Sequence, residues 1–373
     1  MILLYFFIGF LCIRFGVAFI NFWNYLQRRD NKFKKGQGLD ELISILIPAK
    51  NEEKNIIELL RSIQNQDYKR FEVWILDDQS NDNTYSLVEK FSKQDPRFQI
   101  VSGLDLPNHW LGKNYACYQL SQKAHGEYLL FLDADVTIHS GLIEDSLIRM
   151  KTHSLSLLSY FAVQEIKSWG EWLTVPLMNY FLLSFLPLNL VQSNKAPSLA
   201  ASNGQFMLFN KKDYDHYQWH SQVKNQVAED YEICKLIKKN DLLAETLLSK
   251  GNLRCRMYSN FEEAIEGFSK NTYALFSYNL AGILLFIGMI SIIYLLPIFY
   301  FSWTSFLMIL LLVLGIRILT SYSSGQSIIK NIIHHPLQIG IMVFICLRSV
   351  FQYYKGTRSW KGRLLNPVLL EAN

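Results

Sequence analysis

FEVWILDD at residues 71–78 and YLLFLDAD at residues 128–135 are the two stretches that decide the fold of this chain. Each is an apolar, strand-like run that ends in carboxylates. Because an unpaired carboxylate is costly to bury, acids that directly follow such runs are expected at the open C-terminal edge of a parallel sheet. That edge is where α/β proteins bind ligands. The two stretches therefore predict an α/β fold with an acidic site at one sheet edge.

The surrounding sequence, from about residue 40 to about residue 270, alternates strand-like and helix-like segments. A strand is predicted over residues 43–47, and a helix with apolar positions at helical spacing follows it. Another strand is predicted over residues 98–101. Alternation of this kind is typical of a parallel α/β sheet. We therefore predict one α/β domain over residues 40–270.

The chain has 373 residues, half of them apolar, which is long enough for a soluble domain and a membrane part. Residues 2–26 carry a single charge, Arg14, and a basic cluster follows at residues 28–35. A cleaved signal peptide would have a basic start and a small-residue cleavage site. The segment instead predicts a transmembrane helix over residues 1–27, with the chain cytoplasmic from residue 30 onward.

Three further apolar stretches, at about 279–300, 303–323 and 337–354, predict membrane helices over residues 279–355. The basic tail at 356–373 is expected in the cytosol by the charge rule. This requires one stretch to be re-entrant or interfacial, and we expect it at 303–333. The sequence thus predicts a multi-pass protein of the cell membrane whose catalytic domain faces the cytoplasm. The net charge of +5 lies near these flanks and indicates anionic lipid as a partner, not nucleic acid.

The Asp-x-Asp pair Asp133 and Asp135 is the candidate metal site. Two carboxylates on a turning segment can reach one Mg²⁺ or Mn²⁺, which usually bridges them to substrate phosphates. Asp135 is predicted to be the direct ligand, and Asp133 to contact the metal together with the sugar or ribose. The structural alternative is that both aspartates only end the strand and start a turn.

Ordered motifs carry a resemblance to a known family: PAKNEE at residues 48–53, DDQSNDNT at 77–84 and DAD at 133–135. They resemble the inverting glycosyltransferases of family 2, which have a Rossmann-like GT-A fold and use nucleotide-diphospho-sugar donors. The resemblance covers about residues 43–240. Beside the terminal apolar stretches, WKGR at 360–363 resembles the branch that glycosylates carotenoids, hopanoids and related lipids, including the diaponeurosporenoate glycosyltransferases.

The resemblance implies roles for individual residues. Inverting transfer needs a carboxylate that takes the acceptor's proton, and the family's Glu-Asp pair places this base at Asp230, beside Glu229. Gly204 and Gln205 would contact the acceptor, although a bulged strand also explains this segment, and Trp360 and Arg363 are further acceptor candidates. Lys113 would reach phosphate or the donor sugar, with a solvated lysine as the alternative. The remaining donor residues, for a nucleotide that we expect to be UDP, would be Pro48, Ala49, Asn51, Glu52, Asp78 and Asp133.

An apolar segment at about residues 172–192 interrupts the α/β pattern and contains Pro176 and Pro187. A full crossing here would put Asp135 and Asp230 on opposite sides of the membrane. We therefore predict an interfacial segment that guides a lipid acceptor, with aromatic rings such as Tyr180 at headgroup depth. A buried core helix is the alternative.

Three functions from different classes follow. The first is inverting transfer of one sugar to a membrane-embedded lipid such as a carotenoid acid, a hopanoid or a glycerolipid. The second is a processive polysaccharide synthase, which the absence of a Gln-x-x-Arg-Trp motif after Asp230 disfavours. The third is a scaffold with a degenerate transferase domain, which the intact acids disfavour.

Overall fold

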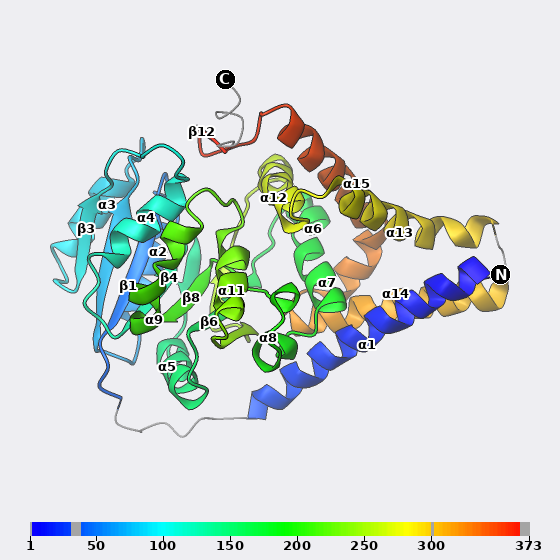
Figure 1. Cartoon of the computed structure of the whole chain (residues 1–373), viewed down its shortest axis with the longest axis horizontal. Helices are drawn as coiled ribbons and strands as arrows, with labels where there is room; N and C mark the ends of the chain where they lie inside the picture. Colours follow the sequence, from blue (N-terminus) through cyan, green and yellow to red (C-terminus); the bar gives the residue numbers. More distant parts are fainter. Residues whose placement is uncertain (1, 31–38, 300–301, 366–373) are drawn as a thin grey trace. The chain divides into compact units, whose positions relative to one another are not determined.

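The computed structural model describes residues 2–30, 39–299 and 302–365, and it forms two compact units (Figure 1). The α/β unit comprises residues 31–163, 189–256 and 361–373, and the helical unit comprises residues 1–30, 164–188 and 257–360. The domain boundaries predicted above stay predictions. Part of the predicted basic cluster, at 31–35, and the end of the tail, at 366–373, lie outside the described residues.

A seven-stranded sheet in the order β3-β2-β1-β4-β8-β6-β9 forms the centre of the α/β unit (Figure 1). Its strands are β1 Ile43–Ala49, β2 Phe71–Asp77, β3 Phe98–Ser102, β4 Tyr128–Leu132, β6 Leu157–Phe161, β8 Phe206–Asn210 and β9 Ala244–Leu248. Strands β3, β2, β1 and β4 are parallel, as predicted, but β8 runs antiparallel to both β4 and β6. The sequence gives no sign of the reversed strand, because reversal changes neither composition nor apolar pattern.

Helices cover this sheet because their apolar positions recur at helical spacing. In α2, Ile56, Leu59, Leu60 and Ile63 are all buried. In β1 the aliphatic side chains of residues 43 and 45–47 are fully buried, which fits a strand covered on both faces. The helices of this unit are α2 Ile56–Gln64, α3 Thr84–Ser92, α4 Gly112–Ser121, α5 Leu142–Thr152, α8 Asn189–Ser193, η1 Pro197–Leu199, α9 Lys211–Tyr217, α10 Trp219–Gln222 and α11 Glu229–Lys239.

The strand order places the chain's acids at a topological switch point. Strand β1 lies between β2 and β4, so the chain proceeds from β1 to β2 and β3 on one side and continues with β4 on the other. Ligands of open α/β sheets bind outside the carboxyl ends of the strands at such a point.

The short strands are β5 Val136–Ile138, β7 Val163–Gln164, β10 Leu253–Cys255, β11 Ser359–Trp360 and β12 Arg363–Leu364.

The helical unit consists of long apolar helices and three shorter ones. They are α1 Ile2–Asp30, α6 Trp169–Thr174, α7 Pro176–Phe185, α12 Phe261–Leu275, α13 Leu280–Phe299, α14 Trp303–Ser323 and α15 Ile328–Tyr354. Among the described residues, Leu4–Arg28, Trp303–Ser323 and Ile328–Tyr354 are long and apolar enough to cross a membrane. Helices α12 and α13 meet this test only as a pair bent by 116°. The stretch predicted at 337–354 thus belongs to a longer helix, which continues through Pro336.

Two arginines inside the apolar helices face protein side chains. The Arg14 guanidinium donates a 2.7 Å hydrogen bond to the Ser184 hydroxyl and lies 5.1 Å from the ring centre of Tyr180. Arg317 lies 4.7 Å from the same ring. Tyr180 is therefore 1% exposed. The prediction that this ring lies at a membrane surface is wrong, because both cations and helices α1 and α14 enclose it.

Candidate functional site

The loop after β1 is fastened to the loop after β2. The Asn51 amide donates to the Ser80 hydroxyl at 2.9 Å, and the Asn51 side-chain oxygen accepts from the Asn81 amide at 2.9 Å. Asn51 has φ 54°, a conformation that asparagine tolerates better than most residues. The predicted donor residues Pro48 and Ala49 lie at the end of β1, where Ala49 pairs in register with Asp77 of β2. Two of the predicted motifs thus form one continuous edge.

The acids of these two loops pair with cations from the C-terminal segment. Asp78 binds the guanidinium of Arg363, which also donates to the Gln79 side chain at 3.1 Å. Glu52 binds the ammonium of Lys361. Arg363, which was predicted to bind the acceptor, pairs in the structure with Asp78, a predicted donor residue. The side chain of Trp360 lies outside the described part of the chain.

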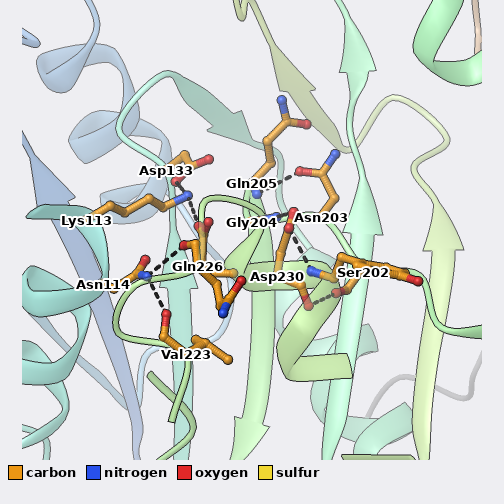
Figure 2. Close-up of polar contacts among 12 residues, drawn as sticks. Lys113, Asn114, Asp133, Ser202, Asn203, Gly204, Gln205, Val223, Gln226 and Asp230 are labelled. Carbon is orange, nitrogen blue, oxygen red and sulfur yellow. Dashed lines mark hydrogen bonds and ion pairs between the residues drawn. The ribbon is translucent and has the colours of Figure 1, made fainter. Parts of the chain in front are cut away.

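Lys113 joins the Asp-x-Asp motif to the Glu-Asp motif. It lies in the first turn of α4, which begins at Gly112. Its ammonium is 2.7 Å from Asp133 Oδ1 and 2.9 Å from Glu229 Oε1 (Figure 2). Burial alone would lower the pKa of Lys113, but the two carboxylates hold it well above its usual value. Lys113 is therefore paired with two carboxylates, while 40% of its side chain remains exposed.

Asp230 occupies the first turn of α11 as a partly buried carboxylate. Its Oδ2 accepts from the Gly204 amide at 2.9 Å and its Oδ1 accepts from the Tyr231 amide at 2.7 Å (Figure 2). Burial and the neighbouring charge of Glu229 raise its pKa to about 6. Glu229 responds oppositely: burial raises its pKa, but Lys113 outweighs this and lowers it. The pair thus contains one fixed anion and one group that can exchange a proton near neutral pH.

Asp135 is a partly buried acid, and the Oδ1 atom of its carboxylate is shielded from solvent. Among the described residues, its Oδ1 atom has no hydrogen-bond partner. Burial, followed by the charges of Asp133 and Glu52, raises its pKa to about 7. No group of three or more His, Cys, Asp or Glu suited to a metal occurs within the described ranges. A pair of carboxylates, one with an unpartnered oxygen, fits a hard divalent cation that takes its other ligands from phosphates and water.

Gly204 occupies a position with no room for a side chain. A Cβ atom there would lie 2.7 Å from the Lys113 ammonium and 3.5 Å from Glu229 Oε1. The preceding Asn203 accepts a 2.9 Å hydrogen bond from the Gln205 amide. Strand β8 begins only at Phe206, so the segment is a turn before the strand and not a bulge within it. Its backbone therefore approaches the charged cluster closely.

Gly204→Ala is expected to reduce turnover at least about tenfold, because the new methyl group must displace the Lys113 ammonium from its two carboxylates. The melting temperature should fall by only a few degrees, since the displaced atom is the end of a flexible side chain. Steady-state kinetics and thermal unfolding measure the two effects. Gly340→Ala is the matched control, because no atom lies within 4 Å of the position that its new methyl group would take. Unchanged turnover in Gly204→Ala would show that the pairing of Lys113 with Asp133 and Glu229 is not needed for transfer.

Two residues of the site were missed from the sequence. The Asn114 side chain donates to the Val223 carbonyl at 2.8 Å and to the Gln226 carbonyl at 3.0 Å, which holds the chain just before α11 (Figure 2). The ring of His220 is 2.7 Å from the Tyr214 hydroxyl, and burial lowers its pKa to about 3. Neither belongs to a recognisable motif. His220 also lines a small, open cavity together with Pro48, Lys113, Asp133, Gly204 and Glu229.

Residues 44–217 match the family model described as Glycosyl transferase family 2. The chain is 29% identical over 248 residues to the 4,4'-diaponeurosporenoate glycosyltransferase of Staphylococcus haemolyticus, covering 64% of this chain and 63% of that protein. It is 33% identical over 101 residues to the GalNAc(5)-diNAcBac-PP-undecaprenol beta-1,3-glucosyltransferase of Campylobacter jejuni, covering 27% and 32% of the two chains. The chain therefore spans less than two thirds of the length of either relative.

A solved structure shares the fold. The mannosyltransferase PcManGT from Pyrobaculum calidifontis, in complex with GDP-Man and Mn²⁺, superimposes with a TM-score of 0.55 and 13% identity. The superposition covers 94% of this chain and 98% of that one. At this identity the likeness concerns the fold alone. It confirms the predicted α/β, GT-A-like fold.

Proposed function

We propose that the protein transfers one sugar from a nucleotide-diphospho-sugar to a lipid acceptor, with inversion at the anomeric carbon. The match of residues 44–217 to the family 2 glycosyltransferase model supports this proposal. The observation that carries this proposal is the link from Asp133 through Lys113 to Glu229, the residue that precedes Asp230. It brings the predicted donor acid and the predicted base pair together at the switch point of the sheet. A binding scaffold would not need this arrangement.

The donor side consists of the two fastened loops. Asn51, Glu52 and Asp78 would hold the nucleotide, and Lys113 would lie near its phosphates or its sugar. Asp133 and Asp135 would hold Mg²⁺ or Mn²⁺, which supplies positive charge for the departing diphosphate. The solved relative in fold contains both a nucleotide sugar and Mn²⁺, which supports this assignment. We expect UDP as the nucleotide.

The acceptor side depends on Asp230. Inverting transfer proceeds by direct attack of the acceptor oxygen, and a base must take its proton as the bond forms. A carboxyl group with pKa about 6 is mostly ionised at neutral pH and still basic enough to accept that proton. The amide of Gly204 fixes its orientation. Gly204 and Gln205 would lie closest to the incoming hydroxyl or carboxyl group.

A lipid is the acceptor class that the rest of the chain favours. The helical unit contains three helices able to cross a membrane among the described residues. One relative is named for a carotenoid acid and another for an undecaprenol-linked glycan. A membrane-held enzyme can take an acceptor whose reactive group lies at the lipid surface. We therefore propose a carotenoid acid, a hopanoid or a glycerolipid rather than a soluble sugar.

The test is transfer by the purified full chain in lipid vesicles. Labelled UDP- and GDP-sugars are supplied with Mn²⁺ and with lipids extracted from the producing host, and products are analysed by mass spectrometry. We expect lipids carrying one added hexose, and loss of product with EDTA. Long carbohydrate chains would favour the processive synthase, and donor binding without transfer or hydrolysis would favour the scaffold.

Topology gives a separate prediction. The cluster at 28–35 and the basic residues Lys355, Arg358, Lys361 and Arg363 all favour the cytosol. We expect a reporter fused after Asn373 to be active only in the cytoplasm, together with one fused at residue 40. Activity of the Asn373 fusion outside the cytoplasm would contradict this orientation.

A further inference from the structure

The segment Lys361–Arg363 lies across both donor loops of the α/β unit. The Lys361 ammonium binds the Glu52 carboxylate and the Lys50 carbonyl oxygen, the latter at 2.8 Å. The Arg363 guanidinium binds Asp78 and Gln79. A short segment more than 280 residues away in sequence thus connects the loop after β1 with the loop after β2.

The backbone of this segment is held in an unusual conformation. Lys361 has φ 47° and Gly362 has φ 79°, so two consecutive residues are left-handed. Glycine adopts this region freely, but lysine does so at a cost. Such strain persists only where surrounding contacts maintain it, and it is frequent at ligand sites. The two ion pairs on either side of Gly362 supply those contacts.

The site carries more acidic than basic groups, and Lys361 and Arg363 offset part of this negative charge. The site contains seven carboxylates, those of Glu52, Asp77, Asp78, Asp133, Asp135, Glu229 and Asp230. It contains four cations, those of Lys50, Lys113, Lys361 and Arg363. With all of these groups ionised, the net charge is −3, and without Lys361 and Arg363 it would be −5, so the two cations reduce the repulsion of a diphosphate. Half of the available positive charge comes from Lys361 and Arg363.

We propose that Lys361 and Arg363 are donor-binding residues that contact the diphosphate of the nucleotide sugar, with Arg363 as the principal contact. This inference rests on the proposed function and moves Arg363 from the acceptor side to the donor side. A guanidinium presents paired donors that match phosphate oxygens. The Arg363 side chain is 24% exposed, so it is held by Asp78 and still open to a ligand. In the same way Lys361 remains 30% exposed beside Glu52.

The close approach of Gly112 supports this placement. A Cβ atom on Gly112 would collide with the Arg363 guanidinium and lie 2.9 Å from Asp78 Oδ2. The first turn of α4, which carries Lys113, is therefore packed directly against the Asp78–Arg363 pair. The N-terminus of a helix favours anions because its amide groups are free. Lys113 and Arg363 thus approach the same region from different parts of the chain.

The test compares ligands that differ only in the diphosphate. Affinities of the full chain in detergent micelles with Mn²⁺ are measured by calorimetry for UDP and GDP, and by competition for uridine and guanosine. Arg363→Gln is expected to weaken diphosphate binding at least about tenfold, the scale of a charged hydrogen bond, and to leave nucleoside binding unchanged. Lys361→Gln should give a smaller loss of the same kind, and Arg363→Lys should retain most of the affinity.

Lys211→Gln is the matched control. Lys211 is also 24% exposed and paired with an acid, Asp215, but it follows Asn210, which pairs with Tyr128 at the opposite end of β4 from Asp133. Thermal unfolding confirms that each variant is folded. Equal losses for nucleosides and diphosphates would overturn the inference, because Arg363 would then only position Asp78. Unchanged diphosphate binding in Arg363→Gln would overturn it too, whereas a wild-type chain that binds no nucleoside diphosphate would overturn the proposed function as well.

Discussion

Asp135→Asn is expected to abolish metal-dependent donor binding and to lower transfer by at least about a thousandfold, because the metal contributes several kcal/mol of charge stabilisation. Asparagine keeps the shape of the side chain and removes its charge. Isothermal titration of Mn²⁺ and UDP together measures the loss of binding, and product formation measures the loss of transfer. Retained transfer that is insensitive to EDTA would contradict the assignment of Asp135 as the metal ligand.

The same substitution is expected to stabilise the metal-free fold. The folded-state pKa of Asp135 is raised to about 7, above the roughly 3.9 of an unfolded aspartate, so the ionised form is disfavoured in the native state. The resulting loss of stability develops as pH rises from about 4 to about 7 and is fully present above that. Asp135→Asn should therefore raise the melting temperature by several degrees at pH 8 with EDTA, and have little effect at pH 4.

Asp78→Asn is the control for this measurement. The Asp78 carboxylate is paired with Arg363, so its neutralisation should not stabilise the protein at any pH. A melting temperature of Asp135→Asn equal to that of the wild type at pH 8 would show that the Asp135 carboxylate is compensated by groups other than a metal.

Asp230→Asn is expected to lower turnover by at least about a hundredfold, the usual contribution of a general base, while donor affinity stays within about twofold. Asparagine can still accept from the Gly204 amide but cannot take the acceptor's proton. Pre-steady-state transfer and nucleotide titration separate the two quantities. A variant that loses donor affinity and keeps its turnover rate would show that Asp230 binds the donor.

The pH profile of the wild type checks the same residue. With the pKa of Asp230 raised to about 6, the ionised base is lost as pH falls through 6. We therefore expect the rate of transfer to fall about tenfold per pH unit below 6 and to level off above 7. A catalytic rate that is flat between pH 5 and pH 8 would exclude this carboxyl group as the base.

The sequence predicted the parts of this protein that local patterns encode. Apolar runs that end in acids predicted β2 and β4 and placed Asp78 and Asp133 at one sheet edge, because burial of an unpaired charge is too costly elsewhere. Ordered motifs predicted the family and its GT-A-like fold. Apolar length predicted the long helices α1 and α14. Each of these signals depends on neighbours within a few residues.

Only the tertiary structure decided the contacts between distant segments. No local sequence pattern indicates that β8 is reversed or that Arg14 and Arg317 enclose Tyr180. The same is true of the contacts that Asn114 makes with the chain before α11. The order of the motifs indicated that Asp133 and Glu229 belong to one site. That Lys113 pairs with both carboxylates was seen only from the distances in the structure. Arg363 was predicted on the acceptor side, yet it pairs with Asp78, 285 residues earlier in the chain. The physical reason is that pairing between charges depends on their separation in space, which the fold as a whole sets.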